Sequence, residues 1–370
     1  MDHSFLYENY PACSTVGRGS SLSHEGHKSL NLENFIDSYT HLYLGNSLNF
    51  YDTWEAPKCI ISDGAYGVLG FQGDTATADG LIDWYLPHIK AWSEKATPET
   101  SLWLWNTEVG WATLHPILEA HGWKYINLNI WNKGKAHIAG NVNTKTIRRF
   151  PIVTEVCGYY IFEPRIKGKQ LKEWLYEEWK KTGLPLNRAN IACGVKNVAT
   201  RKYFDQGHLW YFPPVEMFEK LVNYANEHGI EDYKPYFSTD GIKSLSPEEW
   251  SKMRSHFECP VGYTNVWDRK PLSGKERIRV SEINGKAAHL NQKPLDLMKL
   301  IIEACTNPND VIWEPFGGLF SASLASRNLQ RKSFGAEIVP SYYKTGRERF
   351  IEIHRHITIC RNVYFPALKD

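Results

Sequence analysis

Two short apolar runs, each followed at once by an acid and a glycine-containing turn, constrain the fold of this chain most strongly. The first is Cys59–Ser62, which leads into Asp63-Gly64-Ala65-Tyr66, and the second is Val311–Trp313, which leads into Glu314-Pro315-Phe316-Gly317-Gly318. Apolar runs of this length predict buried strands. Because ligands of open α/β sheets bind at the carboxyl ends of strands, each acid is a candidate ligand contact. The alternatives are an Asp that caps the next element beside a core Tyr, and an ordinary tight turn from a strand into a helix.

Segments with the apolar spacing of helices and of strands alternate along much of the chain. Helices are predicted at 81–93, 112–121, 215–228, 295–305, 321–328 and 341–354, and further strands at 101–105, at 124–131, within 150–162 and at 333–336. This alternation predicts an α/β fold built on a mostly parallel sheet. The apolar share of 42% and the length of 370 residues suit a soluble protein with a large core, as one big domain with an insertion or as two domains.

A basic, helical insertion is predicted at 165–255. From 165 to 203 the chain has ten Lys or Arg against three Glu. Helical patterns at 169–181, 185–193 and 196–204, the last two joined by Gly194, resemble a helix-turn-helix. Because the net charge of the chain is only +2, binding of nucleic acid would depend on a local patch. Candidate contacts to phosphates or base edges are Arg188, Lys196, Arg201 and Lys202, unless these residues form a solvated helix face.

The segment that follows Val311–Trp313 has the features of a nucleotide-type site. Glycines let the backbone approach a ligand closely, and the amino end of the next helix faces that ligand. Glu337 ends the following predicted strand, 23 residues after Glu314, and could accept both hydroxyls of a ribose. The glycine run is not G-x-G-x-x-G and no phosphate-binding Lys follows it, so the ligand need not carry phosphates. S-adenosylmethionine, with its adenosine and cationic sulfonium, fits these features better than a dinucleotide.

Taken together, the motifs resemble those of the β-class amino-methylating DNA methyltransferases of type II restriction–modification systems. Asp63-Gly64-Ala65-Tyr66 matches that family's catalytic motif, D/N/S-P-P-Y/F/W, at its first and last positions. His289–Leu295 is similar to its H-P-T-Q-K-P-x segment, and Glu314–Gly318 is similar to its D-P-F-x-G cofactor motif. Gly45-Asn46-Ser47-Leu48 stands where the family has G-D-x-L. The resemblance covers about 40–164 and 257–350, and the order of the motifs is its most specific feature.

The resemblance implies a Rossmann-like α/β fold with a mixed sheet in a circularly permuted arrangement. An N-terminal arm (1–33) would precede a catalytic half (34–164), an inserted target-recognition domain (165–255) and a cofactor-binding half (256–370). Such a protein transfers a methyl group from S-adenosylmethionine to the exocyclic amine of a base flipped out of double-stranded DNA. Asp63 slightly favours adenine N6, and cytosine N4 stays nearly as good a candidate.

The resemblance also assigns roles to residues of this chain. The catalytic residues would be Asp63, Gly64, Ala65 and Tyr66. The cofactor-binding residues would be Asn46, Asn291, Lys293, Pro294, Glu314, Phe316, Gly317, Gly318, Ser321 and Glu337. Apart from the resemblance, Lys133 is a further candidate DNA contact, unless it lies in an ordinary loop. The family further implies a prokaryotic, cytoplasmic and nucleoid-associated enzyme with a cognate restriction endonuclease, and a homodimer is one option.

Several other classes of site are not indicated. The seven cysteines are scattered and have no C-x-x-C spacing, so neither a zinc site nor a disulfide framework is predicted, and we expect no metal. No stretch is long and apolar enough to predict a membrane span.

The chain also departs from the family at five positions. Gly64-Ala65 replaces Pro-Pro and removes the rigid φ angles of that loop, and Phe320 replaces a glycine and could narrow the cofactor pocket. Asn46 replaces an acid that contacts the cofactor adenine, and Glu314 is longer than the usual Asp. These departures keep open a catalytically silent DNA-binding relative. Because similar motifs serve in methylation of RNA or of glutamine side chains, those activities also stay open.

Overall fold

The computed structural model describes residues 34–69, 74–134, 148–196, 199–280, 286–287 and 291–351. The predicted N-terminal arm at 1–33 lies outside these ranges, as do His289, Leu290 and the last residues of the predicted helix at 341–354. In these ranges, no helix has the length and apolar character needed to cross a membrane.

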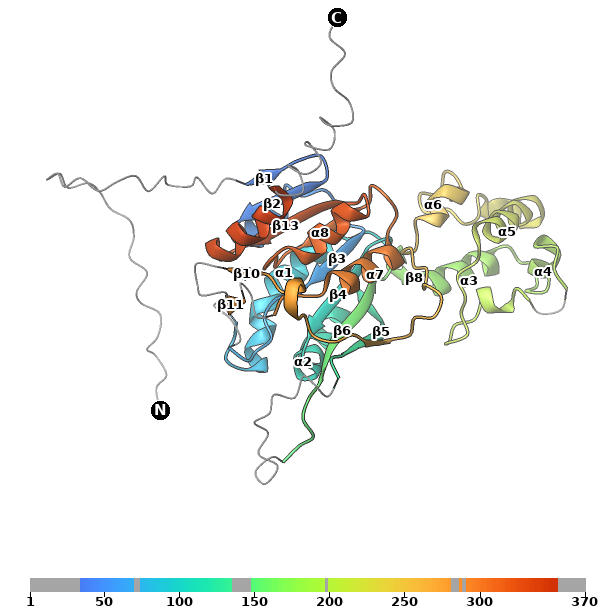
Figure 1. Cartoon of the computed structure of the whole chain (residues 1–370). Helices are drawn as coiled ribbons and strands as arrows, with labels where there is room; N and C mark the ends of the chain where they lie inside the picture. Colours follow the sequence, from blue (N-terminus) through green and yellow to red (C-terminus); the bar gives the residue numbers. More distant parts are fainter. Residues whose placement is uncertain are drawn as a thin grey trace, which may run out of the picture. The chain divides into compact units, whose positions relative to one another are not determined.

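A nine-stranded mixed sheet forms the main body of the described chain (Figure 1). Its strands, in spatial order, are β1 (Phe35–Ile36), β2 (Thr40–Leu44), β13 (Lys332–Glu337), β12 (Val311–Glu314), β3 (Cys59–Ser62), β4 (Ser101–Asn106), β6 (Thr154–Phe162), β5 (Trp123–Asn132) and β9 (Val266–Asp268). The five strands from β2 to β4 are parallel, and β6 runs antiparallel to both β4 and β5. The predicted α/β fold with a mixed sheet is confirmed.

The two predicted acid-bearing strands are direct neighbours in this sheet. Strand β12 pairs in parallel with β3, with Ile312 opposite Cys59 and Trp313 opposite Ile60. Both strands therefore end at the same edge of the sheet, although about 250 residues separate them along the chain. This pairing brings the two predicted sites together.

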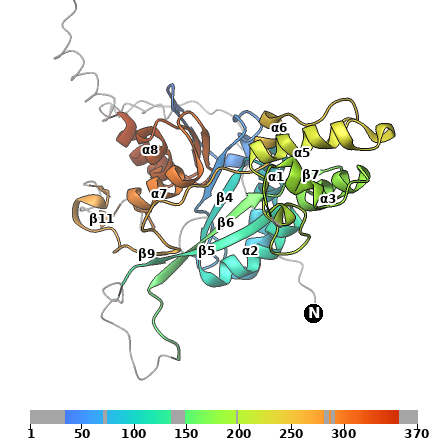
Figure 2. The same cartoon turned by 90° about the vertical axis from the view of Figure 1, so that its right-hand side faces the viewer.

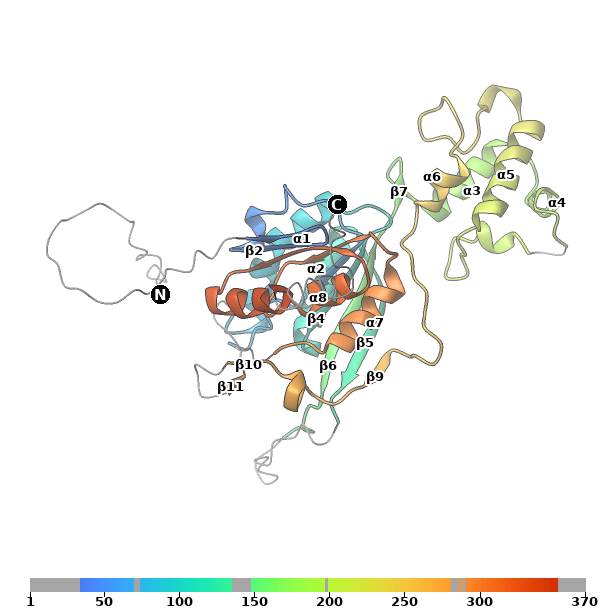
Figure 3. The ribbon, with the colours of Figure 1, turned by 45° about the horizontal axis from the view of Figure 1, so that its top comes forward.

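Helices cover both faces of the sheet (Figures 1 and 3). On one face, α1 (Leu81–Lys95) and α2 (Glu108–Ala120) share an apolar core with Ile60 of β3. On the other face, α7 (Leu295–Cys305) and α8 (Ser321–Asn328) share a core with Cys59 and Ile61. Successive strand residues point to opposite faces, so a strand covered on both sides is apolar throughout, as β3 is. A further helical segment covers 340–351.

The predicted insertion at 165–255 has an apolar core of its own. A small hairpin of β7 (Arg165–Ile166) and β8 (Lys169–Gln170) leads into α3 (Leu171–Lys181), α4 (Arg188–Ala192), α5 (Val215–His228) and α6 (Pro247–Ser251), which gather in one helical cluster (Figure 2). Its core includes Trp174, Phe218 and Trp250, and the rings of the last two stack with centroids 4.1 Å apart. All members of this core lie within 165–255, and the bounds and role of the predicted domain stay a prediction.

The helix-turn-helix prediction for this insertion is wrong in its second helix. Helix α4 ends at a turn in which Gly194 has φ +66°, but the described residues after it form only the short 3₁₀ turn η4 (Arg201–Tyr203). The side chain of Asn190 accepts hydrogen bonds from both the backbone N and the Oγ1 of Thr200, at 3.1 and 2.8 Å. These contacts, across ten positions of the chain, hold the segment back against α4.

The remaining short elements connect the larger ones. They are the 3₁₀ turns η1 (Ser47–Asn49), η2 (Ala78–Gly80), η5 (Glu231–Tyr233) and η6 (Gly274–Glu276), and the hairpin of β10 (Arg279–Val280) with β11 (Lys286–Ala287).

Candidate active site

A pocket opens at the carboxyl ends of β3, β12 and β13. Twelve of the fourteen predicted catalytic and cofactor residues line it, namely Asn46, Asp63, Gly64, Tyr66, Asn291, Lys293, Glu314, Phe316, Gly317, Gly318, Ser321 and Glu337. The other two do not line it: Ala65 is fully buried, and Pro294 is the N-cap residue of α7. The structure therefore brings the predicted catalytic loop and the predicted cofactor motif into one site.

A buried cluster of charged and hydroxyl groups surrounds Asp63. The Nζ of Lys293 lies 2.6 Å from Asp63 Oδ1 and 2.8 Å from Glu155 Oε1. The hydroxyl of Tyr66 lies 2.7 Å from the same Asp63 oxygen, 2.5 Å from Glu155 Oε1 and 3.0 Å from the Nζ of Lys293. Lys133 pairs with the other oxygen of Glu155 at 2.8 Å. Two carboxylates thus balance two ammonium groups around one hydroxyl.

Electrostatics keep the groups of this cluster in defined protonation states. Burial alone would raise the pKa of Glu155, but Lys293 and Lys133 outweigh it and lower that pKa to about 2. Burial alone would lower the pKa of Lys293, but Asp63 and Glu155 outweigh it, so the pKa rises and the ammonium stays charged. Burial, together with the two negative charges, raises the pKa of Tyr66 well above its usual value. Tyr66 is therefore a neutral hydrogen-bonding group at neutral pH.

The loop that carries Asp63 is held by side chains from other elements. The amide of Asn106, at the end of β4, donates to the Ala65 carbonyl at 2.9 Å. The carboxylate of Asp74 accepts the backbone N–H groups of Tyr66 and Gly67, each at 2.8 Å. These hydrogen bonds hold the loop in place, as the fixed φ angles of two prolines would.

Gly64 itself is packed under aromatic rings. A Cβ at this position would lie 2.7 Å from Phe316 Cδ2 and from the Tyr85 hydroxyl, and 2.8 Å from Trp84. No side chain fits there, so a Pro at position 64 would displace the rings that wall the pocket.

On the cofactor side, the predicted acids bind backbone amides. Glu314 accepts hydrogen bonds from the N–H groups of Ala322 and Ser323 and from the Ser323 hydroxyl, at 2.6 to 2.9 Å. Glu337 accepts from the N–H of Gly318 at 2.6 Å and from that of Val339 at 2.7 Å. Burial raises the pKa of both carboxyls to about 7, although these hydrogen bonds lower it.

The structure shows the surroundings of Phe320 and Asn46, two of the residues that depart from the family pattern. Phe320 does not line the pocket: its ring is fully buried against Gly317, Gly335 and Gly346, so the expectation that it narrows the pocket is wrong. It adopts φ 55° and ψ 48°, the left-handed conformation that a glycine would take without strain. Asn46 lines the pocket while its Oδ1 accepts the N–H of Leu48 at 3.0 Å, as the cap of η1.

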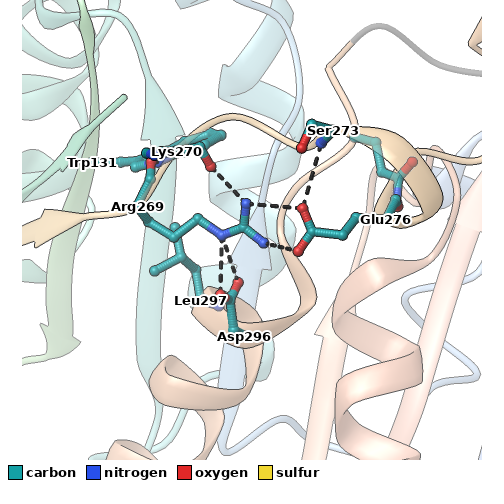
Figure 4. A network of polar contacts seen from close by, with 8 residues as sticks. Trp131, Arg269, Lys270, Ser273, Glu276, Asp296 and Leu297 are labelled. Atoms are coloured by element: carbon teal, nitrogen blue, oxygen red, sulfur yellow. Dashed lines mark hydrogen bonds and ion pairs between the residues drawn. The ribbon is translucent and has the colours of Figure 1, made fainter. Parts of the chain in front are cut away.

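A second polar network holds the start of α7, which follows the pocket residues Asn291–Pro294. Figure 4 shows Arg269 at its centre, between Asp296 of α7 and Glu276 of η6. Its Nε lies 3.0 Å from the first carboxylate and its Nη2 lies 2.6 Å from the second. The Trp131 indole donates to the Arg269 carbonyl at 2.5 Å. Strand β5, which lies between β6 and the edge strand β9, is thereby tied to the start of α7, directly after Lys293.

A family comparison identifies this architecture. The family model for N6/N4 methyltransferases, described as DNA methylase, matches residues 57–348, well over half of the 370 residues. The chain belongs to this DNA methylase family. Type II methyltransferase M.HinfI of Haemophilus influenzae is 36% identical over 102 residues, which is 28% of either chain. Type II methyltransferase M1.MboII of Moraxella bovis is 32% identical over 128 residues, which is 34% of this chain and 48% of that protein.

These alignments span less than half the length of either curated relative. Among solved structures, PvuII DNA methyltransferase (cytosine-N4-specific) aligns with 85% of this chain and 86% of its own, at 14% identity and a TM-score of 0.48.

The predicted DNA contacts of this member of the family fall into two groups. Arg188, Lys196 and Arg201 are exposed on the helical insertion, and so is Lys202, whose ammonium lies 4.2 Å from the ring centroid of Tyr211. Lys133 is different, because its side chain is only 17% exposed and is paired with Glu155. Its placement beside the catalytic loop runs against the predicted DNA contact.

Sequence reasoning missed three polar residues of the methylase site, which are Asp74, Asn106 and Glu155. Glu155 had a readable signal: it is the one acid in Thr154–Phe162, an otherwise apolar strand, and a buried acid requires a partner. The sequence could not name that partner, since Lys293 lies 138 positions away. Asp74 and Asn106 sit in a loop and at a strand end, where polar residues are common and carry little information.

Proposed function

We propose that this protein methylates the exocyclic amino group of a base in double-stranded DNA, with S-adenosylmethionine as the methyl donor. One observation carries the proposal: Asp63 and the glycine turn after Glu314 end adjacent parallel strands and line the same pocket. A methyl donor held by the turn and an amine held by Asp63 would then meet in one cavity. The order of the two motifs, with the catalytic strand first and the cofactor strand last, supports the permuted arrangement.

The residues around the turn fit S-adenosylmethionine. A Cβ at Gly317 would lie 2.2 Å from the Phe320 ring, so the packing of this turn requires glycine at position 317. Glu337 would accept ribose hydroxyls, and the carboxylates in the pocket favour a cationic ligand. When bound, S-adenosylmethionine supplies an electrophilic methyl group on a positively charged sulfur.

The catalytic loop supplies acceptors for the amine. An exocyclic amine is a poor nucleophile because its lone pair is delocalised into the ring of the base. Asp63 would accept one N–H of the amine and the Gly64 carbonyl the other, which localises the lone pair toward the methyl group. The ring of Tyr66 would stack on the base at about 1–3 kcal/mol, while its hydroxyl stays bonded to the cluster behind it.

A base inside a duplex cannot reach these groups, so the target must be flipped out of the helix. We assign target recognition to the insertion at 165–255, whose exposed basic residues suit phosphate contacts. Asp63 favours adenine N6 slightly over cytosine N4. The names of the two curated relatives favour a role in a type II restriction–modification system, with a cognate endonuclease as partner, and a homodimer is compatible with this role. The enzyme would act in the prokaryotic cytoplasm, on the nucleoid.

Transfer of labelled methyl groups tests the proposal. The purified protein is incubated with labelled S-adenosylmethionine and mixed-sequence double-stranded DNA, and with RNA and protein in parallel. We expect label in DNA, and digestion to nucleosides then distinguishes N6-methyladenine from N4-methylcytosine. Label only in RNA or in protein glutamine would contradict the DNA substrate. Cofactor binding without transfer to any polymer would indicate the catalytically silent DNA-binding relative.

A further inference from the structure

We infer that Glu155 is a positioning residue for methyl transfer, which holds one oxygen of Asp63 occupied and leaves the other free for the target amine. This inference rests on the proposed function, and it assigns a role to a carboxylate that lies in none of the recognised motifs. Glu155 does not line the pocket, so it acts through Lys293 and Tyr66.

The two oxygens of Asp63 are in different situations. Oδ1 receives both Lys293, at 2.6 Å, and the Tyr66 hydroxyl, at 2.7 Å. Within the described ranges, no residue donates a hydrogen bond to Oδ2. The Asp63 side chain is 21% exposed, against 4% for Lys293, so a ligand can reach the carboxylate while the ammonium is shielded. The loop thus presents one available acceptor.

The difference between the two Asp63 oxygens depends on the position of the Lys293 ammonium group. An ammonium group has three N–H donors, and Lys293 has three partners: Asp63 Oδ1, Glu155 Oε1 and the Tyr66 hydroxyl, at 2.6, 2.8 and 3.0 Å. Three contacts fix its position. Without Glu155, one donor would lose its partner and Lys293 could swing toward Oδ2, where it would compete with the amine.

Glu155 also orients Tyr66. The phenol has one proton and lies within hydrogen-bonding distance of two carboxylates, so it donates to one of them while accepting from Lys293. This arrangement turns the hydroxyl toward the cluster and fixes the direction of the long axis of the ring that would stack on the base. Lys133 balances the charge on the far oxygen of Glu155, at 2.8 Å.

The cluster also helps to hold a catalytic loop that has no prolines. Gly64-Ala65 lacks the two prolines of the family motif, and the structure supplies external anchors for it instead. Asn106 and Asp74 hold the backbone of the loop, and Glu155 holds its two functional side chains through Lys293 and the Tyr66 hydroxyl. Loss of Glu155 should therefore harm the geometry of the reacting groups more than the binding of either substrate.

The test is Glu155→Gln in the whole 370-residue chain, measured as steady-state methyl transfer to double-stranded DNA. Because a small misplacement of reacting groups can lower a rate about 100-fold, we expect kcat to fall about 10- to 100-fold. KM for S-adenosylmethionine and for DNA should stay within about threefold of the wild-type values. A kcat within twofold of wild type would overturn the inference, and so would a loss confined to KM.

Asp37→Asn is the matched control. Asp37 is a similarly shielded carboxylate, 14% exposed against 11% for Glu155, and it is paired with Arg327 outside the pocket. Its loss should change thermal stability but not kcat. If both variants lower kcat in proportion to their loss of stability, Glu155 is only structural. If Glu155→Gln does not fold, Glu155→Asp replaces it, with an intermediate kcat expected and an unchanged kcat counting against the inference.

A double-mutant cycle with Tyr66→Phe separates positioning from general stabilisation. That change removes the hydroxyl shared by Asp63, Glu155 and Lys293. If Glu155 acts through this hydroxyl, the double variant loses less rate than the product of the two single losses. Losses that multiply would contradict the inference. An inactive wild-type protein would instead reject the proposed function, so the two failures are distinguishable.

Discussion

Two neighbouring regions place acids at one edge of the same sheet. The first is the carboxyl end of β3, and the second is formed by the carboxyl ends of β12 and β13. The surroundings shift the pKa of Glu155, beside the first region, in the opposite direction from the pKa values of Glu314 and Glu337 in the second. Asp63 and Glu155 are paired with lysines, and the pKa of Glu155 is held at about 2. Among the described residues, backbone amides and a hydroxyl donate hydrogen bonds to Glu314 and Glu337, and burial raises the pKa of both carboxyls to about 7, although the charge of Arg349 lowers that of Glu314.

This difference suits the two roles that we propose. In the catalytic cluster the acids lie against ammonium groups, and Lys293 and Lys133 lower the pKa of Glu155 because a nearby opposite charge favours the charged form of a carboxyl. A carboxylate that awaits a cationic ligand can remain close to its titration point until the ligand adds positive charge nearby. Carboxylates would thus have a catalytic role at one strand end and a ligand-binding role at the next.

The largest expected effect comes from Asp63→Ala. It removes the acceptor of the amine, so methyl transfer should fall by at least about 1,000-fold, near the upper range for a lost acid–base group. Binding of S-adenosylmethionine should stay within about tenfold of wild type, because the glycine turn is intact. Transfer is measured with labelled cofactor and binding by calorimetry. Loss of cofactor binding with little loss of transfer would mean that the two regions have been assigned in reverse.

Glu337→Gln should show the reverse pattern. Hydrogen bonds to a charged group are worth about 1.5–3 kcal/mol, so the Kd for S-adenosylmethionine should rise about 10- to 100-fold. At saturating cofactor, kcat should stay within about threefold, because the Asp63 cluster is unchanged. Calorimetry gives the Kd, and turnover at increasing cofactor gives kcat. A strong fall in kcat at saturating S-adenosylmethionine would contradict the separate roles proposed for the two regions.

Local sequence patterns predicted the cofactor side well. Helices α7 and α8 lie at the predicted 295–305 and 321–328, and β12 ends at the predicted acid. Each of these features depends on spacing within a dozen residues, and the bonds of Glu314 reach only to Ala322 and Ser323. Helix α2 begins at Glu108, earlier than the predicted 112, because Thr107 caps it by accepting the Gly110 N–H.

The catalytic side was less predictable, because its contacts are long-range. The sequence indicated Asp63 and Tyr66, but Lys293 was assigned to the cofactor alone, and Glu155 and Asp74 were missed. Lys293 reaches Asp63 across 230 positions and depends on the pairing of β3 with β12. The helix-turn-helix failed for a related reason, since the Asn190–Thr200 contact overrides the helical pattern after Gly194.

The pH dependence of stability should show an effect of intermediate size. The pKa values of Glu314 and Glu337 are raised from 4.5 to about 7, so the folded state binds their protons more tightly than the unfolded state does. Their contribution to stability is complete below about pH 4.5 and is lost as the pH rises through 7. Glu155 has the opposite sign: its contribution is present above about pH 4.5 and is lost as the pH falls toward 2.

The ligand-free protein should therefore melt at a lower temperature at pH 8 than at pH 5, as measured by differential scanning fluorimetry. Glu314→Gln cannot titrate, so the melting temperature of this variant should fall by less over the same range. Saturating S-adenosylmethionine should flatten the profile further. Identical profiles for wild type and variant would show that the carboxyl of Glu314 does not titrate in this range.

The smallest expected effects separate Lys133 from the basic residues of the insertion. Arg201→Gln should weaken DNA binding a few-fold and lower the slope of log Kd against log salt by about one, the result expected when one phosphate contact is lost. Its kcat at saturating DNA should not change. Fluorescence anisotropy at several salt concentrations gives the slope.

Lys133→Gln should leave that slope unchanged, because its ammonium pairs with Glu155 at 2.8 Å and is mostly shielded from solvent. It removes one of the two cations that keep Glu155 ionised, so the pKa of Glu155 should rise and kcat should fall a few-fold. A changed salt slope would instead restore the DNA contact predicted from the sequence. The two variants each remove one positive charge, so any difference between them reflects where that charge lies, in the catalytic cluster or on the surface of the insertion.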